Sequence, residues 1–197
     1  MFSLIPCVAG CGQAALSGAK TCALHSMNQE LETLRFLQIF QQQRTIKDLN
    51  LAGLTFEAVD FSQKRFFGCN FSHARFIRCI FSGVFVRMSF FDFVECLECD
   101  FSHSDMQFVS FGGSHIQDCT FEGSELVHVN FGGSRITDCT FNNSNLYNSR
   151  FVNANLRSVD FIDCNIKKTF FVRAMQEGVS FRSSNTAEAV FELGEGL

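Results

Sequence analysis

The chain has 197 residues, of which 46% are hydrophobic, 26 are Phe and one is Pro, and its formal net charge is −4. This length fits one repeat domain with an N-terminal addition, and no apolar run is long enough to cross a membrane. Residues 48–197 hold twelve Lys or Arg and eighteen Asp or Glu. Direct nucleic-acid binding by this part is not expected, because phosphate contacts need clustered basic side chains.

The first 25 residues contain a cysteine-rich motif. Cys7, Cys11, Cys22 and His25 follow the spacing Cys-x3-Cys-x10-Cys-x2-His. Two close pairs joined by a short loop can place three thiolates and one imidazole around a tetrahedral Zn2+. The segment also resembles small zinc knuckles found beside other domains in phage and bacterial proteins. We expect a closed, structural Zn2+ site; the alternative is four ordinary residues in a poorly ordered tail.

A helix is expected next, over residues 26–43, followed by a linker that ends at residue 47. Glu30 and Glu32 lie early in it and Arg44 lies late, as the helix dipole favours. We expect this helix to cap the repeat domain, because the open end of a repeat structure must be covered; a partner-binding helix is the alternative. The apolar residues that recur at helical spacing are Met27, Leu31, Leu34, Phe36, Leu37, Ile39 and Phe40.

A period of five residues dominates the rest of the chain. From Leu51 to Phe191 every fifth residue is apolar at 27 of 29 positions, and most of these are Phe. Two residues before each of them lies a small residue, with exceptions only at Leu49, Leu54 and Lys64. A period of five fits neither a helix nor a strand, so it predicts a repeat architecture.

A second period, of twenty residues, lies over the first. The eleven residues that begin with Phe111-Gly-Gly-Ser recur from Phe131 with two changes. This predicts a coil of four short sides in which residue n stacks on residue n+20, with successive coils about 4.8 Å apart. Between Phe101 and Phe171 the central residues alternate Phe with Met, Ile or Leu. Two opposite sides should therefore contain Phe ladders and the other two aliphatic ladders.

The five-residue units resemble the pentapeptide repeat family, whose motif is roughly Ala-(Asp/Asn)-Leu-x-x with Leu or Phe at the centre. Residues 153–157 (Asn-Ala-Asn-Leu-Arg) and 143–147 (Asn-Ser-Asn-Leu-Tyr) fit it closely. The resemblance covers about residues 48–191. It implies an all-β solenoid, a right-handed quadrilateral β-helix of about seven 20-residue coils. The predicted parts are a zinc-knuckle-like segment (1–25), a capping helix and linker (26–47), the β-helix (48–192) and a tail (193–197).

Most cysteines belong to the repeat. We interpret them as small buried hydrophobic residues, because ligands from one straight column cannot easily surround a metal tetrahedrally. Buried unpaired thiols favour a cytoplasmic protein, and residues 1–7 are too short and lack the charged start of a secretory signal. Seven cysteines fall at inward positions: Cys79, Cys99, Cys119 and Cys139 every twenty residues, and also Cys69, Cys96 and Cys164.

No catalytic constellation is present in the sequence. The five His form no recognisable catalytic motif, and no phosphate loop, nucleophile elbow or metalloprotease helix occurs. We therefore expect a protein without enzymatic activity.

Outward positions around the second and third coils are unusually apolar. They indicate a docking patch for another protein, or a surface that the N-terminal module or a second copy of the chain covers. These positions are Phe67, Ile77, Ile80, Phe85, Met88, Phe90, Phe93, Leu97 and Phe108, of which Phe85, Met88, Phe90, Phe93 and Phe108 are the candidate partner-binding residues.

A stretch of acids is the second surface feature. Some pentapeptide repeat proteins are acidic rods that resemble DNA, bind DNA gyrase or topoisomerase IV, protect it from quinolones and typically dimerise through their C-terminal ends. The eight acids here fit that resemblance, although Lys and Arg between residues 135 and 173 weaken it. Gln176 and Thr186 interrupt the apolar central column near the C-terminal end of the repeat. The last coil could therefore be an open end of the rod or a contact in a homodimer. The candidate acidic surface is Asp92, Glu95, Glu98, Asp100, Asp105, Asp118, Glu122 and Glu125.

The sequence thus favours a non-enzymatic scaffold that presents a rod to another protein. The alternative is a DNA-mimic modulator of type II topoisomerase. Nucleic-acid binding through the zinc knuckle is a weaker alternative.

Overall fold

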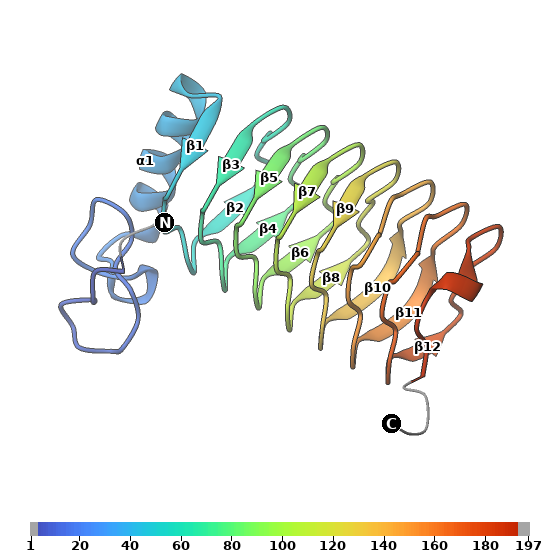
Figure 1. The fold of residues 1–197 in the computed structure, drawn as a ribbon. Coiled ribbons are helices and arrows are strands. Elements are labelled where there is room, and N and C mark those ends of the chain that lie inside the picture. The colour runs from blue at the N-terminus through green and yellow to red at the C-terminus, as the bar shows by residue number, and fades with distance from the viewer. Residues whose placement is uncertain (1–3, 193–197) are drawn as a thin grey trace.

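The computed structural model describes residues 4–192 (Figure 1), so the expected tail at 193–197 lies outside the described residues. One α-helix is followed by a series of strands. Most of the strands are short, because every five-residue unit turns a corner after about three extended residues. The elements are η1 (Ala23–His25), α1 (Gln29–Gln42), β1 (Thr45–Lys47), β2 (Thr55–Glu57), β3 (Arg65–Phe67), β4 (Arg75–Ile77), β5 (Phe85–Arg87), β6 (Glu95–Leu97), β7 (Asp105–Gln107), β8 (His115–Gln117), β9 (Glu125–Val127), β10 (Arg135–Thr140), β11 (Asn155–Asp160), β12 (Met175–Glu177) and η2 (Thr186–Glu188).

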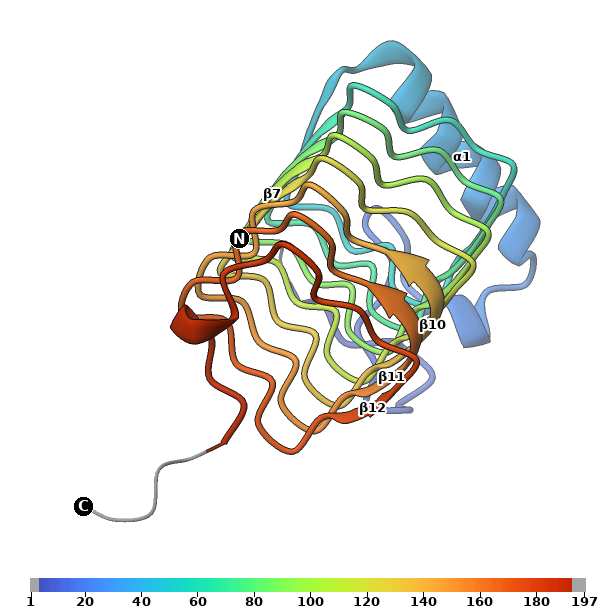
Figure 2. The ribbon, with the colours of Figure 1, turned by 90° about the vertical axis from the view of Figure 1, so that its right-hand side faces the viewer.

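The chain winds into a four-sided solenoid of about seven coils (Figures 1 and 2). We number its sides in the order in which the chain meets them. The first side contains the sheet β1-β3-β5-β7-β9, and the third contains the sheet β12-β11-β10-β8-β6-β4-β2. Isolated parallel bridges join the coils on the second side, from Asn50–Asn70 onward, and on the fourth, from Asp60–Ile80 onward.

The predicted twenty-residue register is confirmed on all four sides. Ile46 pairs with Phe66 in the first sheet, and the isolated bridges keep the same offset. Pairing begins at Thr45, three residues before the expected start of the repeat domain at residue 48.

Two ladders of Phe rings fill the axis. On the fourth side, from Phe61 to Phe181, neighbouring rings stack with centroids 4.6–5.2 Å apart. On the second side, from Phe71 to Phe191, the centroids are 4.7–5.3 Å apart. The two ladders meet edge to face, an arrangement that aromatic quadrupoles favour. From the fourth coil on, the buried central residues of the other two sides are aliphatic, so the predicted alternation is confirmed: Met106, Leu126, Leu146 and Ile166 on the first side, and Ile116, Ile136 and Leu156 on the third.

The small inward residues also bond the coils together. The Ser114 hydroxyl donates to the Phe91 carbonyl at 2.8 Å, and the Cys79 thiol donates to the Phe56 carbonyl at 3.3 Å. Both bonds join residues 23 apart, so Ser, Thr and Cys at these positions tie each coil to the preceding one. In the described part of the chain every buried side-chain nitrogen and oxygen has a hydrogen-bond partner.

The capping helix is present but shorter than predicted. It begins after Asn28, whose side chain accepts from the Leu31 N–H at 3.0 Å, a standard N-cap contact. Phe36 and Phe40 are buried, and the Phe40 ring lies 5.7 Å from that of Phe61 at the end of the rod.

The apolar face of α1 is narrower than the sequence pattern suggests. Leu31 and Leu34 are exposed, as is Met27, which precedes the helix. Arg44, expected near the helix C-terminus, lies beyond it, and the last turn has no basic residue.

Candidate functional site

The four predicted metal ligands lie together, and their ligand atoms all fall within 4.8 Å of one another. The sulfurs of Cys11 and Cys22 are 3.7 Å apart, and Nδ1 of His25 lies 3.4 Å from the Cys22 sulfur and 3.9 Å from the Cys7 sulfur. Tetrahedral Zn2+, with bonds of about 2.3 Å to sulfur and about 2.0 Å to nitrogen, separates such atoms by about 3.5–3.8 Å. The geometry therefore fits a four-coordinate metal ion.

Local turns bring the ligand pairs together. The Gly10 N–H donates to the Cys7 carbonyl at 3.0 Å, and Gly10 has a φ of 68°, which only Gly adopts at little cost. This turn places Cys11 beside Cys7. In η1 the His25 N–H donates to the Cys22 carbonyl at 3.1 Å, which brings the second pair to the same point.

The donor set suits a structural ion. Cys7 and Cys22 are buried, whereas Cys11 and His25 reach the surface. A hydrogen bond from the Cys22 backbone lowers the pKa of the Cys7 thiol, and burial raises the pKa of the Cys22 thiol. Three thiolates and an imidazole satisfy Zn2+ completely, so such a site has no open position for substrate.

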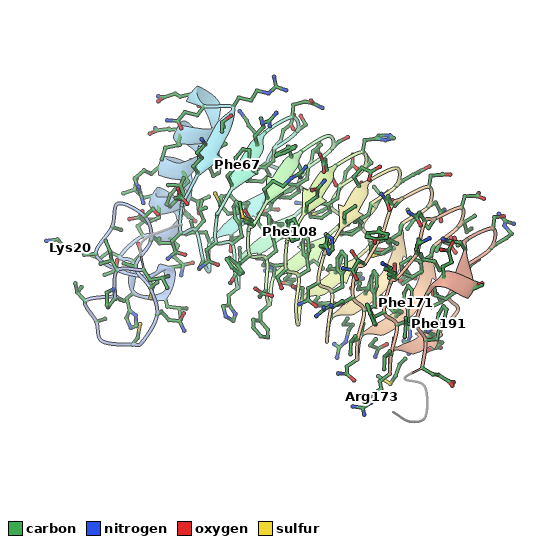
Figure 3. All side chains as sticks on the ribbon, viewed as in Figure 1. Lys20, Phe67, Phe108, Phe171, Arg173 and Phe191 are labelled. Carbon is green, nitrogen blue, oxygen red and sulfur yellow. The ribbon has the colours of Figure 1, made fainter. Side chains whose placement is uncertain are left out.

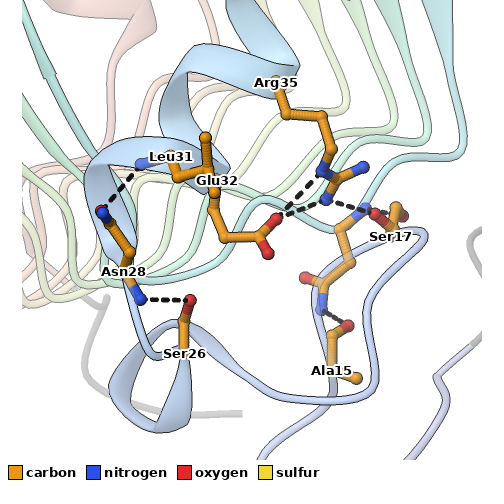
Figure 4. Close-up of polar contacts among 8 residues, drawn as sticks. Ala15, Ser17, Ser26, Asn28, Leu31, Glu32 and Arg35 are labelled. Carbon is orange, nitrogen blue, oxygen red and sulfur yellow. Dashed lines mark hydrogen bonds and ion pairs between the residues drawn. The ribbon is translucent and has the colours of Figure 1, made fainter.

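Asn50 attaches the metal-binding segment to the solenoid. It is fully buried, its Nδ2 donates to the Ala15 carbonyl at 2.7 Å, and its backbone N–H donates to the Ser17 hydroxyl at 2.7 Å. Arg35 of α1 donates to the Ser17 carbonyl at 2.7 Å, and Asn70 of the next coil donates to Oδ1 of Asn50 at 2.9 Å. The metal-binding segment, α1 and the first two coils thus form one hydrogen-bonded unit. Figure 4 shows the contact between Arg35 of α1 and Ser17.

The corners of the rod have a backbone feature that the sequence analysis missed. Every residue from Asp48 to Ser183 whose number ends in 3 or 8 has a positive φ. This conformation is easy for Gly and tolerable for Asn and Asp, but it costs about 1–2 kcal/mol for other residues. The signal was present in the sequence, because Gly, Asn and Asp recur at these positions.

Three candidate partner-binding residues occupy such corners. Met88, Phe93 and Phe108 have φ values of 48°, 56° and 54°, and their side chains are 62%, 59% and 58% exposed. Met88 and Phe108 lie in one column, at the corner between the first and second sides. Phe93 lies at the corner between the second and third sides, where its ring stacks on that of His73 with centroids 5.1 Å apart.

The other two candidates have different surroundings. Phe85 is half-buried on the first side, and the guanidinium carbons of Arg65 and Arg87 lie 4.2 and 3.7 Å from its ring centroid. Phe90 lies on the second side, beside the corner that contains Met88. The five candidates therefore do not form one patch, and only Met88, Phe90 and Phe108 gather at one corner.

The eight candidate acids spread over the whole circumference. Arg75 pairs with Glu95 at 2.5 Å, and Arg87 pairs with Asp105 at 2.7 Å, so two of the acids are neutralised locally. Asp92 is on the second side, Glu95 on the third, Glu98 and Asp118 at the corner between the third and fourth, Asp100 and Glu122 on the fourth, and Asp105 and Glu125 on the first.

Within residues 4–192 no helix is long and apolar enough to span a lipid bilayer. Comparison with curated protein sequences finds no match. Two sequence profiles do match: one described as "Pentapeptide repeat region" covers residues 114–191, and one described as "Pentapeptide repeats (8 copies)" covers residues 47–83.

Several solved structures are similar to this chain. A pentapeptide repeat protein from the thylakoid lumen of Arabidopsis thaliana is 24% identical, with 46% of this chain and 59% of that one covered and a TM-score of 0.36. Rfr23, a pentapeptide repeat protein from the cyanobacterium Cyanothece 51142, is 12% identical over 81% and 99% of the two chains, with a TM-score of 0.33. QnrB1, a plasmid-mediated fluoroquinolone resistance protein, is 16% identical over 76% and 83%, with a TM-score of 0.31. With its two profile matches and its stacked five-residue units, the chain belongs to the pentapeptide repeat family.

Proposed function

We propose that this protein is a non-enzymatic, cytoplasmic scaffold that binds another protein through outward side chains at the corners of its rod. The observation that carries this proposal is the presence of Met88, Phe93 and Phe108 at exposed left-handed positions. Each costs about 1–2 kcal/mol of backbone strain, and each forgoes much of the roughly 1.5–3 kcal/mol that burial of a large apolar side chain contributes.

The fold has no need of these three residues. Asn148 occupies the column of Phe108, and Gly113 occupies the column of Phe93, with the same left-handed backbone. Since residues that fit this conformation better build equivalent corners, the bulky side chains are better explained by a contact outside the chain.

The metal site serves the scaffold in this proposal. A Zn2+ held by Cys7, Cys11, Cys22 and His25 would fix the segment that Asn50 attaches to the first coil. A segment so short depends on its metal for folding, so the ion would complete the cap of the solenoid.

The experiment compares chemical cross-linking and affinity capture by the wild-type protein and by a Met88→Asn, Phe93→Asn, Phe108→Asn variant. Asn suits the left-handed corners, so the variant should unfold at the same temperature as the wild type or higher, yet lose its captured partner. His103→Asn with Ser158→Asn is the matched control at two other left-handed corners, between the fourth and first sides and between the third and fourth. Capture of the same proteins in equal yield by the triple variant contradicts the proposal.

A second candidate function is modulation of type II topoisomerase by an acidic edge. Glu98, Asp118 and Asp138 stack in one corner column, and none of the three forms an ion pair within residues 4–192. A regular row of carboxylates presents charge in the manner of a phosphate backbone. The test is gyrase supercoiling with and without a quinolone; no effect at micromolar protein removes this alternative.

A further inference from the structure

One edge of the rod combines aromatic and basic side chains. It is formed by the three outward columns around the corner between the first and second sides, and we call it the aromatic–basic edge. Its charged members are Lys47, Asp48, Arg87, Arg150, Lys167, Lys168 and Glu188, and its large apolar members are Phe67, Met88, Phe90, Phe108, Val127, Tyr147 and Phe170. Figure 3 shows Phe67 and Phe108 along the rod. Two acids, Asp48 in the first coil and Glu188 in the last, lie among five cations, although the chain as a whole is acidic.

Ring and side-chain contacts join successive coils along this edge. The Phe108 ring stacks on the His128 imidazole with centroids 4.9 Å apart and an interplanar angle of 8°. Nδ1 of His128 lies 2.7 Å from the Asn148 amide nitrogen. The Lys168 ammonium lies 5.6 Å from the centroid of the Tyr147 ring. A continuous surface of flat rings and polar groups therefore runs from the fourth coil toward the C-terminal coils.

A groove lies within this surface. It has a volume of about 240 Å3 and is lined by Phe108, His128, Val129, Asn130, Asn148 and Arg150. Its floor is the buried Val129, a small inward residue, and its two walls are the corner column of Phe108 and the neighbouring column of the second side, with Asn130 and Arg150. The groove has an aromatic wall at its N-terminal end and the Arg150 guanidinium at its C-terminal end.

The cations at the C-terminal end are available for a partner. Arg87 is paired with Asp105, and Lys167 is paired with Glu188 at 2.6 Å. In contrast, Arg150 and Lys168 form no ion pair within residues 4–192, and their described charge contacts are with the rings of Phe170 and Tyr147.

The opposite edge of the rod has the reverse character. The equivalent groove, at the corner between the third and fourth sides, is lined by acids and small polar residues: Asp118, Cys119, Thr120, Asp138, Cys139, Thr140, Ser158 and Asp160. Two edges built on the same backbone therefore differ only in side-chain chemistry. A ligand that suits one edge is repelled by the other, which fixes the side on which it binds.

We infer that the aromatic–basic edge binds an extended peptide segment of a partner protein, with apolar side chains against Met88 and Phe108 and acidic side chains against Arg150 and Lys168. This inference rests on the proposed scaffold function and names the chemistry of the partner. Phe108 and Lys168 are three coils apart, or about 14 Å at the usual strand spacing, and an extended peptide covers that distance in about four residues. The motif is thus an apolar pair followed, about four residues along, by Asp or Glu.

A peptide fits this edge better than a nucleic acid does. Two unpaired cations attract one or two carboxylates, whereas a polynucleotide places a phosphate beside every coil and needs clustered cations. The Glu125 carboxylate on the adjoining first side also repels a phosphate chain.

The experiment selects ligands from a displayed library of random dodecapeptides on the full-length, zinc-loaded protein. The enriched sequences should contain the apolar-then-acidic pattern. Synthetic copies should bind at least tenfold more weakly to a Met88→Asn, Phe108→Asn variant and to an Arg150→Gln, Lys168→Asn variant. High salt should weaken binding by the wild type but not by the second variant, since the salt-sensitive contact is already absent there.

His103→Asn is the matched control, because His103 is exposed and has the same left-handed backbone at the corner between the fourth and first sides. It should leave peptide binding unchanged. The inference is overturned by enrichment of basic peptides, by dependence on His103, by an empty selection, or by binding of a 20-nucleotide dT strand in place of peptides. If Met88 and Phe108 prove dispensable while Phe93 is needed for capture of a cellular partner, the proposed scaffold function is supported. The proposed peptide-binding role of the aromatic–basic edge is then wrong.

Discussion

Lys64 donates from its ammonium to the backbone carbonyls of Phe40 and Gln43, so a residue of the first coil caps the C-terminus of α1. The last turn of α1 has no basic residue of its own, and a helix C-terminus favours a cation. Lys64 also occupies the inward column that is otherwise small. The other exceptions, Leu49 and Leu54, belong to the same coil. The breaks in the pattern therefore mark the layer that meets the cap.

Replacement of Lys64 by Met should loosen the cap. The change keeps most of the side-chain volume but removes two charge-assisted bonds to orphan carbonyls, which should cost about 1–2 kcal/mol of unfolding free energy. Urea denaturation followed by circular dichroism measures the loss. Lys20→Met, an exposed change in the metal-binding segment, is the control and should stay within about 0.5 kcal/mol of the wild type. Equal midpoints for both variants contradict the capping role.

Removal of the metal should loosen one end of the rod only. The metal-binding segment bonds to the first coil through Asn50, and a solenoid transmits damage mainly to neighbouring coils. After chelation, amide exchange should rise in residues 7–25 and around Asn50 but stay slow around Phe131. Elemental analysis should find one Zn2+ per chain before chelation and none in a Cys22→Ser variant. Uniform exchange along the chain with and without chelator contradicts this expectation.

Much of the solenoid could be predicted because each coil repeats the same chemical demand: a large residue for the axis and a small one for the corner. Neither demand depends on distant parts of the chain, so the spacing alone predicts that Phe111 fills the axis and that Ser114 lies at a corner. The ends of α1 were harder to place. Leu31 and Leu34 continue the helical pattern yet face solvent, because the side of the helix that meets the rod is the one with Phe36, Phe40 and the partly buried Leu37 and Ile39.

The candidate sites also differ in how far the sequence could predict them. The four metal ligands lie close together in the sequence, so their spacing revealed them as a group. The outward apolar residues looked like one patch because they are near in sequence. Yet Phe90 and Phe93 lie at opposite ends of one side, and Phe85 lies between two arginines. Which corner a residue occupies depends on its number modulo twenty, not on its distance along the chain.

Truncation of Phe111 to Ala should cost about 3–5 kcal/mol, because the cavity left in a close-packed core collapses only in part. Its ring lies between those of Phe91 and Phe131, at 4.9 and 5.3 Å. Phe181→Ala should cost clearly less, since that ring is half-buried and, within the described residues, has a ladder neighbour on one side only, Phe161. Urea denaturation of the two variants compares them; equal losses argue against the ladder as the source of stability.

The inward cysteines should resist modification in the folded protein. Burial raises the pKa of the Cys69 thiol to about 11, above the ordinary value of about 8.5. A thiol reagent at pH 8 should therefore label Cys69 only after denaturation. Because the folded state holds the proton to higher pH, the thiol's contribution to stability is complete below about pH 8.5 and is lost as pH rises through about 11. Mass spectrometry of the labelled native and denatured chain identifies the reactive sites.

Acid should open the last coil before the rest of the rod. The Lys167 ammonium lies 2.6 Å from the Glu188 carboxylate and lowers its pKa, while Glu188 raises the pKa of Lys167. A lowered carboxyl pKa means that the stabilising contact is complete above the ordinary Glu value of about 4.3 and is lost as pH falls through the folded value. The raised pKa of Lys167 acts in the opposite direction: its ammonium keeps the proton, and with it the contact, until the solution is strongly alkaline.

The measurement is the protection factor of two amides in that coil. The Lys168 N–H donates to the Glu188 carbonyl, and the Val190 N–H donates to the Thr169 carbonyl, each at 2.8 Å. Both should lose protection between pH 5 and pH 3, while amides near Phe111 keep theirs. In a Lys167→Gln variant the protection of Lys168 and Val190 should already be low at pH 5 and should depend little on acid. An acid response that survives this substitution must come from another carboxyl group, and the Lys167–Glu188 pair would then not hold the end of the solenoid.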